Sequence, residues 1–284
     1  SGRMRVSEIF TPTSLIETLG LLRKHEDALL WAGGTEILRL RVARRPELPP
    51  TIVSLDKVPE LRAIGRSDRA LDLGAMSSLA QLSALGEGAV PEALAEAAAG
   101  VGTEGLRNLA TLGGNLLGRE RFGDLFPALA CLDAIAEFRS ASGSRWMAVG
   151  RLAGRDRKPL IPTGEILVRV RVPFDPWDLS LVRKIGYPLW PAADSGLFTC
   201  LARAAKGSLY EFRAALGGPL FLRDRETETE LIGKRLPLQR RDIESARASW
   251  RNRFEEDGVG APWIERFLAA VDESFDALRA GASR

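Results

Sequence analysis

Two glycine-rich turns constrain this chain more than any other feature of its sequence. They are residues 31–36, WAGGTE, and residues 111–115, TLGGN. Glycine lets a ligand come close to the backbone. A turn that opens a helix leaves N–H groups unpaired and carries partial positive charge. Either turn alone could be a plain connection, but two of them could grip a diphosphate from two sides. A nucleotide cofactor is therefore the first hypothesis.

The first turn lies between a predicted strand and a predicted helix. Residues 28–31 form a short apolar run typical of a buried strand. Thr35 can cap the helix that follows. An earlier amphipathic helix begins after Ser14, which forms a capping-box pattern with Glu17. The second turn ends residues 100–115, a stretch predicted to be a loop.

Helices and strands alternate up to about residue 164, and strands then dominate. The earlier part has predicted strands at residues 51–55 and 71–75, helices at residues 91–99 and 124–132, and a hairpin over residues 134–149. The later part has predicted strands at residues 166–172, 179–185, 197–204 and 210–216, then helices at residues 242–251 and 263–278. Consecutive strands with short gaps predict an antiparallel sheet with helices packed on it.

The supply of cysteine and histidine excludes several kinds of site. The chain has 2 cysteines, Cys131 and Cys200, so it cannot ligate an iron–sulfur cluster by itself. So few cysteines suit a reducing compartment, and we expect a cytoplasmic protein. The only histidine, His25, lies at a predicted helix end and is expected to be solvent-exposed. A multi-histidine metal site is excluded, and catalysis would fall to a cofactor.

The charge and hydropathy of the chain argue against two classes of partner, nucleic acids and membranes. The formal net charge is +3, from 40 basic and 37 acidic residues, with no long run of like charge. No nucleic-acid partner is therefore predicted. No apolar stretch approaches the roughly 18 residues that a membrane span needs, so no membrane association is predicted.

Several other features have two interpretations. Residues 100–105 match the G-x-G-x-x-G pattern, but the alanine-rich run before them is typical of a helix and argues against a Rossmann fingerprint. Asp124 either caps the helix after it or binds a ligand. Lys184 is either a solvated strand residue or a cation near a ligand. Trp31, Trp177 and Trp190 favour packing over stacking on a ligand.

Five segments in order carry a family resemblance. They are residues 32–37 (AGGTEI), 111–116 (TLGGNL), 124–130 with the pattern D-x-x-P-x-L, 164–173 with an E-I-L strand ending in proline, and 214–218 (AALGG). Together they resemble the FAD-binding medium subunit of molybdenum hydroxylases of the xanthine dehydrogenase and carbon monoxide dehydrogenase type.

The resemblance implies an α+β fold. We expect a two-part FAD-binding domain of the PCMH type over residues 4–175, with its two subdomains divided near residue 60. A smaller α+β domain, an antiparallel sheet with helices, would occupy residues 176–284.

The resemblance also implies a function. The chain would be an FAD-dependent oxidoreductase subunit that passes electrons from an iron–sulfur subunit through FAD to NAD or another acceptor. Substrate would be hydroxylated on a separate molybdopterin-binding large subunit.

The family motifs assign site residues to positions of this chain. Those for the diphosphate and ribityl chain are Trp31, Ala32, Gly33, Gly34, Thr35, Glu36, Ile37, Thr111, Gly113, Gly114 and Asn115. Leu117 and Leu167 would touch the adenine. Asp124 would bind sugar or ribityl hydroxyls, and Lys184 would lie near the flavin ring.

Two departures from the family keep other functions open. Arg119, Glu120 and Arg121 stand where the family usually has a small residue, Ser and Pro, and residues 187–195 match poorly. A divergent relative that has lost FAD and acts as a structural or binding module is the alternative. A stand-alone flavoenzyme acting on a small carbohydrate or wall precursor would need an acid/base residue near the ring, and no obvious one is present.

Overall fold

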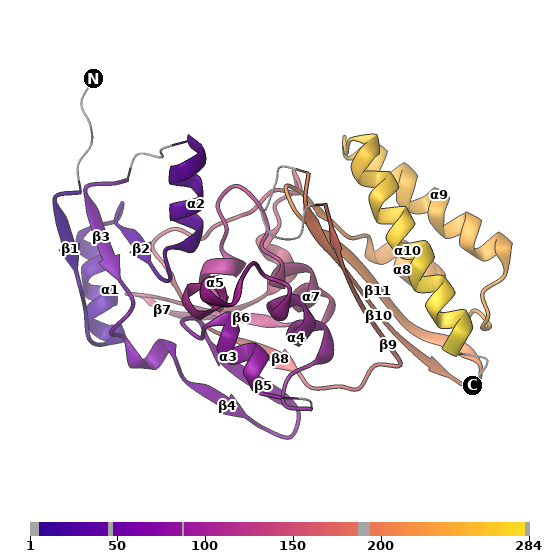
Figure 1. Cartoon of the computed structure of the whole chain (residues 1–284), viewed down its shortest axis with the longest axis horizontal. Coiled ribbons are helices and arrows are strands. Elements are labelled where there is room, and N and C mark those ends of the chain that lie inside the picture. The colour runs from indigo at the N-terminus through magenta and orange to yellow at the C-terminus, as the bar shows by residue number, and fades with distance from the viewer. Residues whose placement is uncertain (1–5, 45–47, 87, 187–193, 282–284) are drawn as a thin grey trace.

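The computed structural model describes residues 6–44, 48–86, 88–186 and 194–281, without the side chains of residues 40–44, 280 and 281. Three sheets follow one another along an elongated molecule (Figure 1). Residues 187–193 of the divergent stretch, which include Trp190, lie outside the described residues.

The first sheet holds the first glycine turn. Its elements are β1 (Glu8–Phe10), α1 (Leu15–Lys24), β2 (Leu29–Trp31), α2 (Thr35–Arg44) and β3 (Thr51–Ser54). The three strands are parallel in the order β1-β3-β2. Ser14 caps α1 by accepting from the Glu17 N–H, as predicted. The turn therefore connects the edge strand β2 directly to α2.

The second sheet is antiparallel, in the order β4-β5-β8-β6-β7. Its strands are β4 (Ile64–Arg66), β5 (Ala70–Gly74), β6 (Ile135–Ser140), β7 (Gly143–Ala148) and β8 (Ile166–Pro173), with short 3-10 helices η1 (Pro59–Leu61) and η2 (Val149–Leu152). The predicted hairpin is confirmed as β6 and β7. We expected β8 to join the strands that follow it, and this was wrong: it pairs with β5 and β6. Its period-2 pattern specified a strand but not the partner.

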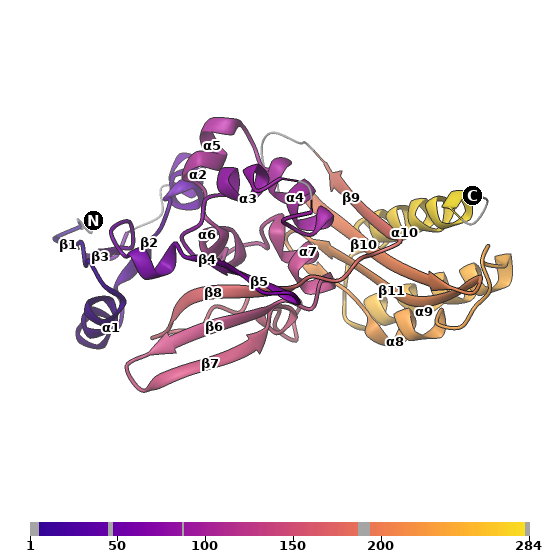
Figure 2. The same ribbon diagram turned by 90° about the horizontal axis from the view of Figure 1, so that it is seen from below.

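The helices α3 to α7 lie on one side of this sheet (Figure 2). They are α3 (Leu79–Ala84), α4 (Glu92–Ala99), α5 (Glu104–Leu109), α6 (Leu112–Leu116) and α7 (Leu125–Cys131). The loop predicted for residues 100–115 was wrong, because α5 and α6 form there. Thr103 and Thr111 cap them by accepting from the N–H groups of Leu106 and Gly114. Such short helices give no measurable apolar period.

The third sheet is antiparallel, in the order β12-β11-β10-β9. Its region contains β9 (Leu179–Ile185), β10 (Gly196–Ala205), β11 (Ser208–Gly217), β12 (Phe221–Leu222), α8 (Arg225–Glu230), α9 (Arg240–Glu256) and α10 (Ala261–Gly281). In β10, Phe198 and Cys200 are buried with α9 and α10, whereas Leu197 and Leu201 join the core around α7. Because both faces of β10 are covered, the third sheet is firmly joined to the second.

Candidate functional site

The fold brings the two glycine turns into contact. A Cβ atom at Gly33 would lie 1.8 Å from the carbonyl oxygen of Leu109 and 3.4 Å from the Cα of Ala110. These two residues directly precede Thr111, which opens the second turn. Gly33 is therefore required by close backbone approach, and the turns, far apart in sequence, form one site.

The first turn presents unpaired backbone donors. In the described part of the chain, the N–H groups of residues 33–37 meet no protein acceptor, and the first bond of α2 runs from Leu38 N–H to the Gly34 carbonyl. Gly34 has φ +72° and lies against the Trp31 indole, where a Cβ would come within 2.5 Å. Trp31 thus packs against the turn, as predicted. Such donors at a helix start suit a phosphate.

The second turn is different, because the protein itself occupies its donors. Leu112 N–H donates to the Ser77 carbonyl at 2.9 Å, and Gly113 N–H donates to the Ala75 carbonyl at 2.8 Å. Gly114 N–H donates to the Thr111 hydroxyl at 3.1 Å. Asn115 N–H donates to the Thr111 carbonyl at 2.9 Å. Our expectation of free N–H groups was therefore wrong for this turn.

Asn115 connects the second turn to α7. Its Oδ1 accepts from the Leu125 N–H at 2.9 Å. Gly123 allows this approach, since a Cβ there would lie 2.4 Å from the same Oδ1. Asn115, rather than Asp124, satisfies the start of α7: Asp124 makes no capping hydrogen bond with its side chain. Asp124 therefore stands at the N-cap position of α7, as one interpretation expected, but its side chain does not cap the helix.

Asp124 forms an ion pair with Lys184, so the structure joins two of the predicted site residues. Lys184 Nζ donates to Asp124 Oδ2, and their side chains are 22% and 10% exposed. Lys184 lies in β9 opposite Leu197 of β10. The pair therefore links the start of α7 to the third sheet.

More charges lie beside the first turn. On α2, Arg39 donates to both carboxylate oxygens of Glu36, at 2.9 and 2.6 Å, and this bond raises the pKa of Arg39. Arg121 interacts electrostatically with Asp124, Arg39 and Glu36, while burial lowers the pKa of its guanidinium. Arg121 Nη2 also donates to the Ser195 carbonyl at 2.6 Å. Charges of alternating sign thus run from α2 to β9.

The AALGG segment has a packing role in this fold. Phe122 N–H donates to the Gly218 carbonyl at 2.8 Å, and the Phe122 ring packs against Phe126 and Phe221. A Cβ at Gly217 would lie 2.9 Å from Pro127. These glycines let the loop before α7 lie against the third sheet.

The remaining predicted residues lie at the edge of this site or in the core. Leu117 ends α6 and is half-buried against the core around α7, and Leu167 of β8 is 4% exposed in the same core. Trp177 packs between Arg203 and Arg213, as predicted. His25 is half-buried against the Phe10 ring, so its predicted exposure was wrong.

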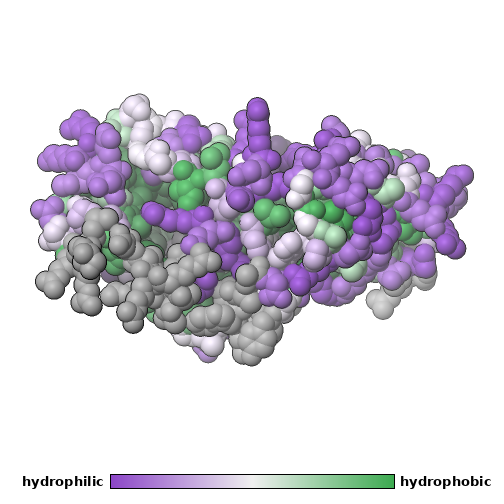
Figure 3. All heavy atoms as spheres, turned by 90° about the horizontal axis from the view of Figure 1, so that it is seen from above, coloured by the Kyte–Doolittle hydropathy of each residue, from purple (hydrophilic) through white to green (hydrophobic). Residues whose placement is uncertain are grey.

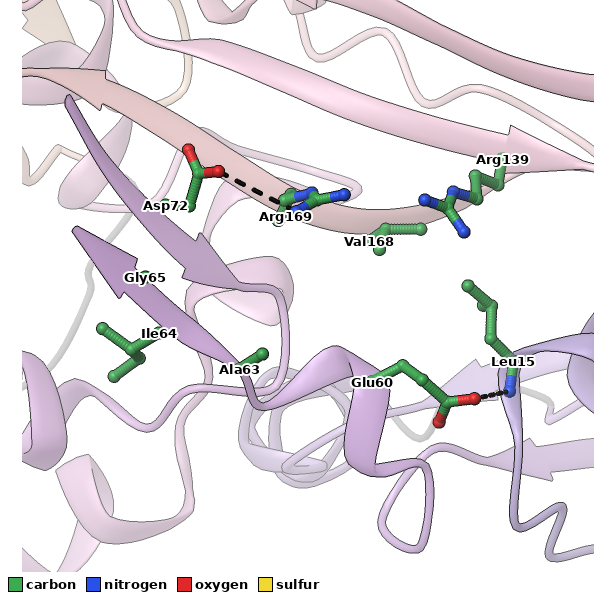
Figure 4. Close-up of a pocket in the computed structure, with 9 residues that line it drawn as sticks. All are labelled: Leu15, Glu60, Ala63, Ile64, Gly65, Asp72, Arg139, Val168 and Arg169. Carbon is green, nitrogen blue, oxygen red and sulfur yellow. Dashed lines mark hydrogen bonds and ion pairs between the residues drawn. The ribbon is translucent and has the colours of Figure 1, made fainter. Parts of the chain in front are cut away.

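A pocket of about 330 Å³ lies elsewhere, between α1 and the second sheet (Figure 4). In it the Leu15 N–H donates to Glu60 at 3.0 Å, and Asp72 lies 3.8 Å from Arg169. None of the predicted site residues lines it. The described residues contain no cluster of three or more His, Cys, Asp or Glu side chains able to hold a metal ion. None of the described helices is long and apolar enough to cross a membrane.

The residues at the two turns fit FAD. Among the described residues, the N–H groups of the first turn have no protein acceptor, and the absent Cβ of Gly33 lets the backbone just before the second turn lie against the first. One view of the surface is mostly hydrophilic, with apolar side chains visible only in separate places (Figure 3).

Residues 4–175 match the family model described as "FAD binding domain in molybdopterin dehydrogenase". This match covers more than half of the chain. The chain belongs to this family. The resemblance seen in the sequence motifs is thereby confirmed, and FAD is the cofactor of this family.

Curated proteins of similar sequence agree. The chain is 32% identical over 174 residues to the nicotinate dehydrogenase FAD-subunit of Eubacterium barkeri, covering 59% of this chain and 58% of that one. It is 34% identical over 177 residues to aldehyde oxidase 2 of Cavia porcellus, covering 57% and 13%. The chain thus spans less than two thirds of both. It is 30% identical over 219 residues to 6-hydroxypseudooxynicotine dehydrogenase complex subunit alpha of Paenarthrobacter nicotinovorans, covering 74% and 72%.

Solved structures share the fold over its whole length. A chain of carbon monoxide dehydrogenase from Hydrogenophaga pseudoflava matches with a TM-score of 0.83 at 22% identity, covering 98% of both chains. Quinoline 2-oxidoreductase from Pseudomonas putida 86 matches at 0.80 and 21% identity, covering 100% of both. This confirms the predicted α+β fold class of the PCMH type.

Sequence reasoning missed Arg39 and the part that Arg121 takes in the site. The available signal was that Arg39 lies three residues after Glu36 on one helix, a spacing at which side chains meet. No local signal placed Arg121, because its neighbours come from α2, α7 and the segment before β10.

Proposed function

We propose that this chain is the FAD-binding electron-transfer subunit of a molybdenum hydroxylase-type oxidoreductase. It would receive electrons from an iron–sulfur subunit and pass them through FAD to NAD or another acceptor. A molybdopterin-binding large subunit would carry the substrate reaction. We also propose residues 4–175 and 176–284 as its two domains, and the cytoplasm as its location.

The observation that carries the proposal is the contact between the two glycine turns beside the Asp124–Lys184 pair. When bound, FAD supplies the redox chemistry, which the side chains of this chain cannot supply. The N–H groups of residues 33–37 would bind the diphosphate, and Asp124 would accept from sugar or ribityl hydroxyls. Lys184 would hold positive charge near the ring, where it favours a reduced, anionic flavin.

A flavin titration tests this proposal. We expect the apo-chain to bind added FAD stoichiometrically, with a shifted flavin absorption band and quenched flavin emission. Reconstitution with iron–sulfur and molybdopterin-binding partners should then give substrate-dependent bleaching of the flavin. Failure to take up FAD would contradict the proposal.

A structural or binding module without flavin is the second candidate. The full occupation of the second turn's N–H groups favours it, because that turn holds its shape without a ligand. This candidate predicts a stably folded chain that does not change its melting temperature when FAD is added, so a thermal shift assay separates the two.

A further inference from the structure

The pocket between α1 and the second sheet is lined by side chains that the proposed function does not use. Its volume of about 330 Å³ falls within the range of small-molecule sites, roughly 300 to 1,000 Å³. One wall comes from β5, β6 and β8, and the rest of the lining comes from α1, η1 and residues 63–65 (Figure 4). No residue of either glycine turn lines it, so the pocket is a separate candidate site.

Two arginines of the sheet wall are fixed by one buried carboxylate, that of Glu137, which is 3% exposed. Arg139 Nε donates to its Oε1 at 2.8 Å, and Arg169 Nε donates to its Oε2. Figure 4 shows the two guanidinium groups turned toward each other over Val168. Among the described residues, neither Nη atom of Arg139 has a protein acceptor, and those of Arg169 have only an ion pair of 3.8 Å with Asp72.

The sheet wall carries one net positive charge. Arg139 and Arg169 share the single negative charge of Glu137. The other carboxylate of this wall, Asp72, is matched by Arg171 through two hydrogen bonds at 2.7 and 2.8 Å. The wall can therefore accept one carboxylate, because the guanidinium fork matches a carboxylate in shape and charge. A second negative charge on a ligand would find no partner there.

The facing wall carries one negative charge, that of Glu60. Its Oε1 accepts from the Leu15 N–H at 3.0 Å. Hydrogen bonds from the backbone N–H groups of Leu15 and of Glu60 itself lower the pKa of this carboxyl group, so it is ionised at neutral pH. A carboxylate accepts several hydrogen bonds, so Glu60 can also accept from an ammonium group. Between the charged walls the lining is apolar, with Leu15 and Val168 5% and 4% exposed.

We propose that this pocket binds a small amino acid of the leucine type, with a carboxylate, an ammonium group and an aliphatic side chain. The carboxylate would accept from the Nη atoms of Arg139 and Arg169. The ammonium group would donate to Glu60, and the aliphatic part would lie against Leu15 and Val168. The inference goes beyond the proposed function and does not depend on FAD.

Binding in this pocket should stabilise the folded chain. Its lining joins α1 and η1 to the second sheet, and a ligand that binds only the folded state shifts unfolding by mass action. We therefore expect leucine to raise the melting temperature of the full chain, both with and without FAD.

Three molecules that share a carbon skeleton test the two charges separately. They are leucine, isocaproate, which lacks the ammonium group, and isoamylamine, which lacks the carboxylate. Calorimetric titration into the full chain should give leucine a Kd of about 1 mM, because both charged walls are open to water. Isocaproate and isoamylamine should each bind about tenfold more weakly or worse, since each loses one charge-assisted hydrogen bond.

Two variants assign the charges to residues. Arg139→Gln should weaken leucine about tenfold and remove its advantage over isoamylamine. Glu60→Gln, which keeps an oxygen for the Leu15 N–H, should remove the advantage over isocaproate. Arg145→Gln is the matched control, because this exposed arginine of β7 binds Glu165 and does not line the pocket. It should change none of the three affinities.

Several results would overturn the inference. They are isocaproate binding as tightly as leucine, leucine binding that Arg139→Gln leaves unchanged, and no leucine binding up to about 10 mM. If Arg139→Gln fails to fold, Arg139→Lys decides: weaker leucine with unchanged isoamylamine supports the inference, and unchanged leucine overturns it. FAD uptake is measured on the same chain. Leucine binding without FAD uptake would contradict the proposed function alone, and FAD uptake without leucine binding would contradict this inference alone.

Discussion

The two glycine turns have similar sequences, but their backbone N–H groups differ in whether the protein supplies acceptors for them. The N–H groups of residues 33–37 face no protein acceptor in the described chain, whereas those of residues 112–115 are all bonded within the protein. The first turn is open to a ligand, and the second is a support. A glycine motif therefore indicates which backbone conformation is possible, but not which N–H groups remain available to a ligand.

This difference in hydrogen bonding comes from the segments that pack against each turn. The second turn packs against residues 75–77, whose carbonyls accept two of its N–H groups, and Thr111 accepts two more. The first turn leaves the edge strand β2 and enters α2 at once, and no acceptor for its N–H groups lies among the described residues. Unpaired donors at a helix start persist only where water or a ligand can reach them.

The largest expected effect comes from Gly33→Ala. A methyl group would lie 1.8 Å from the Leu109 carbonyl oxygen, so the two turns must separate. We expect a loss of about 3 kcal/mol in the free energy of unfolding, the upper end of the usual cost of overpacking, because the methyl group would meet rigid backbone. FAD binding should be undetectable. Urea denaturation and FAD titration measure both.

Gly20→Ala is the matched control, because a Cβ there would meet no atom within 4 Å apart from its chain neighbours and the backbone of its own helix. It should be neutral or stabilise α1 by up to about 1 kcal/mol. If Gly33→Ala kept both stability and FAD affinity, the close contact between the turns would not be needed for folding or for FAD binding.

Hydrogen exchange tests the comparison directly. In the FAD-free chain, amides of residues 112–115 should exchange at least about tenfold more slowly than those of residues 34–37, because bonded amides exchange only after local opening. Added FAD should slow residues 34–37 and leave residues 112–115 nearly unchanged. Equal exchange in the two turns before FAD is added would show that their N–H groups do not differ in protection.

Asn115→Ala should remove the side-chain acceptor at the start of α7. The Leu125 N–H would lose its partner, which costs about 1 to 2 kcal/mol of stability, the usual range for a lost cap. Asn115→Asp is the control, since it keeps an oxygen in place and adds favourable charge at a helix start. Thermal melts of both variants should separate the two. Equal losses would show that Oδ1 is not the group that matters.

The smallest effect is expected for Thr111→Val, which removes the hydroxyl that accepts from the Gly114 N–H. Stability should fall by about 1 kcal/mol, and FAD affinity should follow that change without a separate loss. Thr111→Ser should restore the wild-type values. A large loss of FAD affinity at unchanged stability would mean that the second turn binds FAD directly, like the first.

Much of the fold followed from local patterns. Ser14 and Glu17 fixed the start of α1, the apolar run before the first turn became β2, and the hairpin at residues 142–144 became β6 and β7. These elements depend on neighbours a few residues apart. In contrast, α5 and α6 were missed, and β8 was placed in the wrong sheet, because a strand's partner is chosen by distant residues.

The candidate site shows the same division. Motif positions alone proposed Gly33, Gly113, Asp124 and Lys184, and the fold joins the last two in an ion pair. Arg121 was noticed only as a departure from the family. Its electrostatic interactions with charged residues of α2 and its hydrogen bond to Ser195 join segments far apart in the chain, and no local pattern contains that information.

The sequence by itself determined the family, the FAD cofactor and the positions of the two turns, because glycine, threonine and capping residues act over a few residues. Only the tertiary structure decided which turn keeps its N–H groups unpaired. It also decided which charged side chains meet beside that turn. Hydrogen bonds and charge pairs between distant segments form only once the sheets have packed. Those contacts are the reason that two turns of similar sequence have different roles.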